Sequence, residues 1–282
     1  MRTLPLPTLN AADALKDCAD NISDAGLVTR LKAIAPLVKK AEKDYLARGP
    51  KAELYLIGSA TDVGALVTKK EMTRVYDGTF VRKTSPVRQD YYDVLFASAP
   101  YGTCPFCFHR SVATLDHYLP KAKYPALAIT PANLVPSCFD CNKGKSTTGA
   151  VSQGSQILHP YFDDVDDEIW LFANMIEQDP PAVTFEVRAP QDWPMVKRER
   201  VAAHFRDLKL NALFTAQGGR LINDIGQRLN ELREKGGVVA VSEYLAAEAD
   251  TRRSKATNSW QAAAYDAMSS SVFFCAYEHP PG

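Results

Sequence analysis

Two short stretches, Cys104-Pro105-Phe106-Cys107 and Cys138-Phe139-Asp140-Cys141, decide how the middle of this chain folds. Each C-x-x-C pair can present two sulfur atoms to one ion, and two such pairs complete the ligand set of a tetrahedral zinc site. Four thiolates leave no coordination position for water or substrate. We therefore expect Cys104, Cys107, Cys138 and Cys141 to hold a structural Zn²⁺, and any catalytic residues to lie elsewhere in the same segment.

The chain shows no feature of an exported protein. Its N-terminus, Met1 to Pro7, lacks the continuous apolar stretch of a secretory signal. The apolar runs of the sequence are far shorter than the ~20 residues that span a bilayer. We expect a soluble, cytoplasmic protein with no membrane partner, and in that reducing compartment paired cysteines bind metal instead of forming disulfides.

The composition excludes two broad classes of protein. With 282 residues, 46% of them hydrophobic, the chain can form one large or two modest globular units, which excludes a disordered protein. Its 33 Lys and Arg balance 33 Asp and Glu, which excludes a nucleic-acid binder that works through overall positive charge. Any basic surface must therefore be local.

Three regions follow one another along the chain, and together they predict an α+β, mainly helical fold. Residues 1-99 show helical periodicity, and residues 100-163 lose it while holding most of the residues with chemical meaning. Residues 164-282 are expected to be mostly helical. The expected helices cover 25-47, a segment starting at Thr68 with a Glu71 capping box, a segment starting at Ser85-Pro86, 194-209, 211-234 and 239-268, with a strand over 183-187 and a helix break at Gly236-Gly237.

Polar residues lie between and after the cysteine pairs in a specific order. Asp116-His117 comes first, Asn133 follows, and Asn142 and Lys145 come directly after Cys141. This order resembles the HNH endonuclease family. With Leu-Asp-His-Tyr-Leu-Pro-Lys at 115-121 and His-Pro-Tyr-Phe-Asp at 159-163, it is similar to HNH nucleases of bacterial anti-phage systems such as Septu. The resemblance implies a zinc-stapled ββα-metal core, covers about 60 of the 282 residues and leaves the helical flanks unexplained.

These side chains suit the hydrolysis of phosphodiester bonds. His117 is expected to be the general base, because an unperturbed imidazole titrates near neutral pH. Asp116 and Asn142 offer oxygen ligands to one catalytic cation, which favours Mg²⁺ or Mn²⁺. Adjacent strand residues point to opposite faces, so Asp116 and His117 can act on one phosphate only at a strand end or distortion. By the resemblance, Asn133 braces the loop that carries the histidine.

Basic residues and one further histidine accompany this motif. Lys121, Lys123, Lys143 and Lys145 are expected to contact nucleic-acid phosphates. A basic stretch over residues 69-88 either extends this track or is a solvated face. Three roles compete for His159: a third ligand of the catalytic ion, a phosphate contact, or a packing residue beside Pro160, Tyr161 and Phe162.

The interpretation that follows is a metal-dependent HNH endonuclease that cuts DNA. The main alternative is a zinc-knuckle module that only binds nucleic acid or protein, and an RNA-directed nuclease is another. Catalysis is favoured by the presence of Asp116, His117 and Asn142, because a module that only binds its partner needs neither a general base nor a site for a hard metal ion. Since an unrestrained nuclease is toxic, the helical flanks are expected to bind a controlling protein, which the resemblance suggests is an ATPase.

Overall fold

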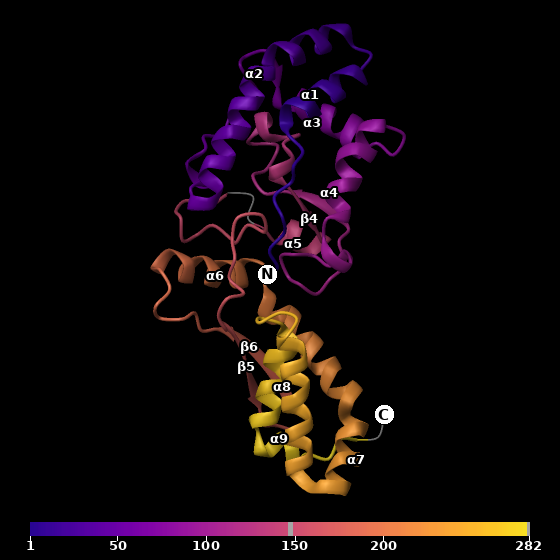
Figure 1. Ribbon diagram of the computed structural model, residues 1–282, viewed down its shortest axis with the longest axis vertical. Helices are drawn as coiled ribbons and strands as arrows, with labels where there is room; N and C mark the ends of the chain where they lie inside the picture. The colour runs from indigo at the N-terminus through magenta and orange to yellow at the C-terminus, as the bar shows by residue number, and fades with distance from the viewer. Residues whose placement is uncertain (146–148, 281–282) are drawn as a thin grey trace. The chain divides into compact units, whose positions relative to one another are not determined.

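The computed structural model describes residues 1–145 and 149–280. The chain divides into two compact units, Met1–Asp164 and Val165–Gly282. Helices dominate both units, and each strand pairs in a small two-stranded antiparallel sheet (Figure 1). The expected mainly helical α+β class is therefore confirmed. Among the described residues, no helix is both long and apolar enough to cross a bilayer.

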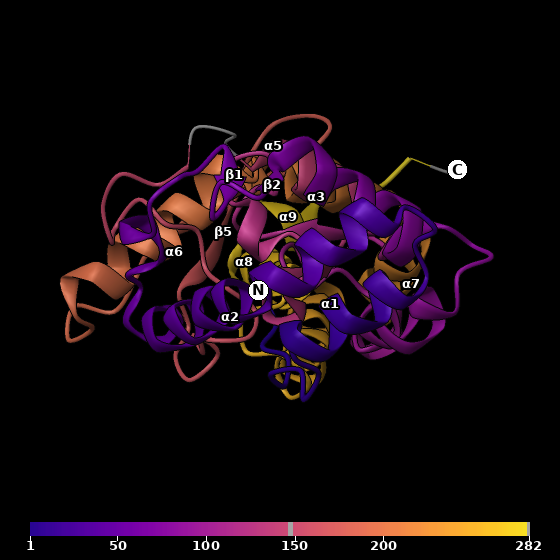
Figure 2. The same cartoon turned by 90° about the horizontal axis from the view of Figure 1, so that it is seen from above.

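The first unit begins with two helices packed side by side, as both views of the ribbon show (Figures 1 and 2). The second of them confirms the helix expected over 25-47, whereas the first was not predicted. The side chain of Asn10 caps that first helix by accepting from the Asp13 N–H. The elements of the unit are α1 (Ala11–Asp20), α2 (Ala25–Arg48), β1 (Asp62–Val63), β2 (Val67–Thr68), α3 (Lys69–Val75), two π-helical stretches (Tyr76–Val81 and Arg88–Asp93), α4 (Val94–Ala97), β3 (Thr114–His117), β4 (Leu134–Ser137) and α5 (Phe139–Gly144).

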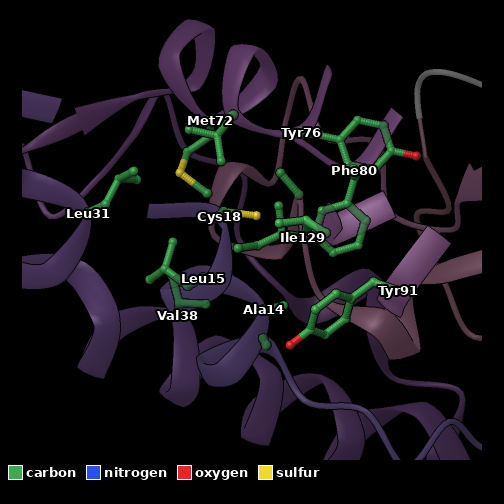
Figure 3. Packing of buried hydrophobic residues seen from close by; sticks show 14 of the residues in the cluster. Ala14, Leu15, Cys18, Leu31, Val38, Met72, Tyr76, Phe80, Tyr91 and Ile129 are labelled. Carbon is green, nitrogen blue, oxygen red and sulfur yellow. The ribbon is translucent and has the colours of Figure 1, made fainter. Parts of the chain in front are cut away.

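One hydrophobic core joins residues 1-99 to the segment that carries the cysteine pairs. Cys18 of α1 and Leu31 of α2 are fully buried in it, together with Ile129 and Leu134 from the later segment. Figure 3 shows Ile129 among the side chains of Cys18, Phe80 and their neighbours. The two regions therefore fold around a common interior as one unit.

The segment with the chemical motif forms a short hairpin followed by a helix. Strands β3 and β4 pair in the register Leu115↔Pro136 and His117↔Leu134. Cys138 caps α5, because its sulfur accepts from the Cys141 N–H. Strand β3 ends at His117, so Asp116 and His117 are the last two residues of the strand.

In the second unit a hairpin packs against long helices. Gly218, in the helix Leu210–Arg253 (α7), allows close packing on this hairpin, because a Cβ there would lie 2.3 Å from Val183. The expected strand over 183-187 is confirmed, and its partner strand was not predicted. The elements are β5 (Leu171–Ile176), β6 (Ala182–Val187), α6 (Met195–Asp207), α7 (Leu210–Arg253), α8 (Trp260–Ser270) and α9 (Val272–Ala276).

Two breaks interrupt the long helical pattern after residue 210. The expected break occurs at Gly236-Gly237, where Gly237 has φ +66° and the two arms of α7 turn back on each other (Figure 1). The helix expected over 239-268 is wrong, because α7 ends at Arg253 and α8 begins at Trp260. The Asn258 side chain explains this second break: its Oδ1 accepts from the Trp170 N–H at 2.8 Å, and its Nδ2 donates to the Glu168 carbonyl at 2.8 Å.

The start of α3 provides a test of local stability. Thr68 and Glu71 form the predicted capping box, and Arg30 pairs with Glu71 at 2.8 Å. The hydrogen bond from the Thr68 backbone N–H, aided by Arg30, lowers the pKa of Glu71 from 4.5 to about 2. The charge therefore stabilises the fold above about pH 4.5, and its contribution is lost as the pH falls towards 2.

We expect Glu71→Gln to lower the free energy of unfolding at pH 7 by about 0.5–1 kcal/mol, the scale of a helix cap. Urea denaturation of both proteins at several pH values would measure this. The difference between them should shrink as the pH falls below about 4.5. A difference that does not change with pH would contradict the role of the carboxylate charge.

Candidate active site

Four buried cysteines from the two C-x-x-C pairs form one cluster. The sulfur atoms of Cys104, Cys107, Cys138 and Cys141 all lie within 4.8 Å of one another. A tetrahedral ion with Zn–S bonds of about 2.3 Å places its sulfur ligands about 3.8 Å apart, which this cluster can accommodate. The predicted ligand set is thus brought together, and it can bind one zinc ion.

The surroundings of these sulfurs favour metal-binding thiolates. Backbone N–H groups of Arg110 and Cys141 donate to the sulfurs of Cys107 and Cys138 at 3.5 and 3.4 Å. The hydrogen bond from Cys104 lowers the pKa of the Cys107 thiol to about 7. The Cys141 thiol instead has a raised pKa, chiefly through its hydrogen bond with Cys104. Four thiolates in one cluster would repel one another, so one sulfur keeps its proton. A bound cation would offset their negative charge and allow all four to be deprotonated.

Beside this cluster, one hollow of about 420 Å³ collects most of the predicted catalytic residues. We call it the active-site hollow. Asp116 and His117 reach it from β3, and Asn142 reaches it from α5. The other lining residues that matter here are Lys121, Lys145, Tyr76, Asp77 and Tyr92.

The ring of His117 is held in a defined orientation. Its Nε2 lies 2.8 Å from the carbonyl oxygen of Ala128, and a carbonyl can only accept. Nε2 therefore carries the proton, and Nδ1 keeps a lone pair. Burial lowers the pKa of His117 from 6.5 to about 3, against the opposing effect of the Ala128 carbonyl, so the imidazole is neutral at pH 7 and does not titrate near neutral pH as the unperturbed value had led us to expect.

Asp116 forms a buried ion pair with Lys145. The Lys145 ammonium donates to Oδ2 of Asp116 and to the carbonyl oxygen of His117, the latter at 2.5 Å. The two side chains are only 5% and 11% exposed. Burial raises the pKa of Asp116 and lowers the pKa of Lys145, while the attraction between them opposes both shifts.

Asn133 is completely buried and does not line the hollow. Its Oδ1 accepts from the Leu119 N–H at 2.8 Å, and its Nδ2 donates to the carbonyl oxygens of Leu119 and Leu127 at 3.0 and 3.1 Å. These bonds join the chain just after His117 to the chain just before Ala128. Asn133 therefore connects the loop after His117 to the segment that carries the Ala128 carbonyl.

The remaining lysines do not share one position. Lys121 lines the active-site hollow, where its Nζ is 2.9 Å from Asp77 and 4.2 Å from the centre of the Tyr76 ring. Lys143 is exposed on α5 and does not line the hollow. Lys123 lines a separate hollow. The four lysines predicted to contact phosphate therefore do not form one group, because Lys145 is buried against Asp116 and the others lie at three different places.

His159 occupies a different environment from the one needed by a metal ligand. It is 1% exposed and lies among aromatic rings, with the Tyr118 and Phe162 centroids at 4.2 and 4.5 Å. The Tyr161 N–H donates to its Nδ1 at 3.1 Å, so Nε2 carries the proton and meets the Tyr45 hydroxyl at 2.8 Å. No lone pair remains for an ion. Of the three roles that compete for His159, these contacts fit the packing role and do not fit that of a third ligand.

Several residues of the hollow could not be found from sequence patterns. The carbonyl of Ala128 orients His117, but every residue has a carbonyl. Tyr76 and Asp77 come from a π-helical stretch almost 40 residues before β3, and the Tyr76 ring lies 4.6 Å from the His117 ring. Only the shared core brings that stretch to the motif.

One known protein is similar to this chain in sequence. The chain is 29% identical over 235 residues to protein ea31 of Escherichia phage lambda, and the match covers 80% of this chain and 79% of the lambda protein. No family profile matches the chain. No solved structure matches it either.

The cysteine cluster leads to a prediction about folding. Purified protein should contain one zinc per chain. Cys138→Ser should lose the metal and most of its soluble yield, because the free energy of zinc binding stabilises the folded state of this segment. Elemental analysis and yield would measure both effects. Cys18→Ala is the matched control, since Cys18 is buried in the hydrophobic core and its thiol pKa is raised by burial to about 12. Well-folded wild-type protein without zinc would contradict the assignment.

Proposed function

We propose that this protein is a metal-dependent HNH-type endonuclease that hydrolyses phosphodiester bonds of DNA. One observation carries the proposal. A neutral histidine with an oriented lone pair, a buried carboxylate and an asparagine side chain line the same hollow beside a four-cysteine cluster. In this interpretation β3, β4 and α5 are the ββα-metal core that the motif implies.

His117 is suited to take a proton from an attacking water. Its Nε2 proton is bound by Ala128, so the basic Nδ1 is the nitrogen left for catalysis. A base must be unprotonated and correctly aimed before reaction, and burial together with the carbonyl contact provides both conditions. The Asn133 bonds hold the two backbone segments that set this aim.

Asp116 and Asn142 fit a hard divalent cation. A carboxylate and an amide oxygen are ligands that Mg²⁺ and Mn²⁺ accept, and both side chains line the hollow. Within the described residues, no hydrogen bond uses the Asn142 side chain. A bound cation would stabilise the negative charge that develops on the scissile phosphate and its leaving 3′-oxygen.

Lysine side chains give the hollow affinity for phosphate. Lys121 and Lys145 line it beside the histidine, and ammonium groups contact phosphate oxygens without reading base sequence. This contact serves DNA and RNA equally. A binding module would use the same lysines, but it would gain nothing from a histidine whose tautomer is set by a buried carbonyl.

The expectation of a controlling partner remains a proposal of the same kind. The residues that line the active-site hollow all come from the first unit. The second unit is therefore the part we assign to the binding of a controlling protein, an ATPase in the anti-phage systems that the motif resembles. Purification of tagged protein from cells that carry its neighbouring genes would test this, and an active, unrestrained nuclease without a bound protein would contradict it.

His117→Ala should remove cleavage. We expect a loss of ~10²- to 10⁴-fold, the usual effect of deleting a positioned base, with the far-ultraviolet circular dichroism unchanged. Plasmid nicking in Mg²⁺ beside a labelled RNA substrate would measure the loss. His109→Ala is the matched control, because His109 does not line the hollow.

The outcomes of this assay separate the three candidate functions. Near-normal nicking by the His117→Ala variant would mean that another residue is the base. Cleavage of RNA alone would favour an RNA-directed nuclease. Wild-type protein that binds DNA without cutting it would favour the binding module.

The melting temperature of a Lys145→Met variant, measured with and without a divalent cation, should show whether Asp116 binds that cation. Removal of one partner of a buried ion pair costs roughly 3–5 kcal/mol, and less where the carboxyl takes up a proton. We expect a lower melting temperature without added divalent metal, and partial recovery in millimolar Mn²⁺, because the ion replaces the lost charge. The double variant Asp116→Asn/Lys145→Met should show no such recovery. A Lys145→Met protein that melts at the same temperature with and without Mn²⁺ would contradict Asp116 as a ligand.

A further inference from the structure

A second hollow adjoins the active-site hollow on the surface of the first unit. Its volume is about 420 Å³, and its lining includes Ser59, Thr61, Lys69 and Lys123. Ala122 lines both hollows. The two depressions are therefore neighbours along one path, with Lys121 in the first and Lys123 in the second.

Backbone hydrogen bonds build this second hollow from three separate parts of the chain. The Ala60 N–H donates to the carbonyl of Lys123 at 2.8 Å, and the Lys69 N–H donates to the carbonyl of Thr61 at 2.9 Å. The capping box at Thr68 fixes the backbone just before Lys69. These contacts hold Lys69 and Lys123 at the same depression, although 54 positions separate them in the sequence.

The charge and a hydroxyl group of this hollow favour an anion. Lys69 forms no ion pair within the described residues, and Ser59 adds a hydroxyl group to the lining. Asp62 is the acidic group present. Its carboxylate accepts from the Ala65 N–H at 2.8 Å and from the Thr61 hydroxyl at 3.0 Å, and these bonds take up part of its charge.

We propose that the second hollow binds a phosphate of the same DNA strand, next to the phosphate that is cleaved. Lys121 and Lys123 are two residues apart, so their backbones are at most about 7 Å apart, a span comparable to that between successive phosphates of one strand. A strand whose scissile phosphate lies at His117 would then place its neighbour between Lys69 and Lys123. This inference rests on the proposed nuclease function and adds the subsite that positions the strand.

Salt-dependent DNA binding tests the subsite. Each phosphate contact contributes about 0.7–0.9 to the slope of log affinity against log salt. In a His117→Ala background, which prevents cutting, Lys69→Met and Lys123→Met should each reduce this slope by about that amount, as measured by fluorescence anisotropy of a labelled duplex. Lys70→Met is the matched control, because Lys70 is the exposed neighbour on α3 and does not line the hollow. Asp62→Asn, which keeps an accepting oxygen but removes the charge, should tighten binding.

The results distinguish this inference from the function on which it rests. If the wild type cuts DNA but the Lys69 and Lys123 variants bind as the Lys70 variant does, the subsite is overturned and the nuclease stands. If binding depends on Lys69 and Lys123 but the wild type never cuts, the nuclease fails and the phosphate site stands. Wild-type protein that binds no DNA would overturn both.

Discussion

The closure of the chain at the four-cysteine cluster is the constraint on which the candidate site depends. Cys104 and Cys107 precede β3 in the chain, Cys138 and Cys141 follow β4, and the four sulfurs meet in one cluster. A hairpin of two four-residue strands is marginal in water by itself. A metal held by all four sulfurs would close the 30 residues between the pairs and fix the register of the strands. It would also fix the start of α5, since Cys138 is the cap of that helix.

A second constraint comes from the core that the motif shares with the N-terminal helices. Ala128 and Ile129 are completely buried in the same cluster as residues of α1 and α2. The carbonyl that orients His117 therefore belongs to a segment held in place by packing. The bonds of Asn133 to Leu119 and Leu127 connect this packing to the loop after β3. Helical residues far from the motif thus determine where the proposed base points.

Burial also sets the electrostatics of the hollow. It keeps the His117 imidazole neutral and makes the Asp116 charge depend on the Lys145 ammonium. In water such a pair is worth little, but here each partner compensates a charge that would otherwise be costly. A metal ion that binds Asp116 would then take the place of the Lys145 ammonium beside the carboxylate. The surface lysines have the opposite character, because Lys69 and Lys143 are exposed to solvent and can meet a phosphate without rearrangement.

Features that depend on residues close together in the chain could be predicted from the sequence by itself. The C-x-x-C pairs, helix α2, the Thr68-Glu71 capping box and the break at Gly236-Gly237 depend on residues of one turn or one face, so their patterns are local. The order of the motif predicts that Asp116, His117 and Asn142 lie together, and these three side chains line one hollow.

Only the tertiary structure decided the features that depend on distant partners. The break before α8 follows from Asn258 binding the start of β5, almost 90 residues earlier in the chain. The sequence leaves three roles open for His159, and the N–H of Tyr161 and the hydroxyl of Tyr45 occupy its two nitrogens. Lys69 and Lys123 become neighbours only because backbone bonds join their segments. A sequence shows which groups are available, but which of them meet depends on how burial and hydrogen bonding bring remote segments together.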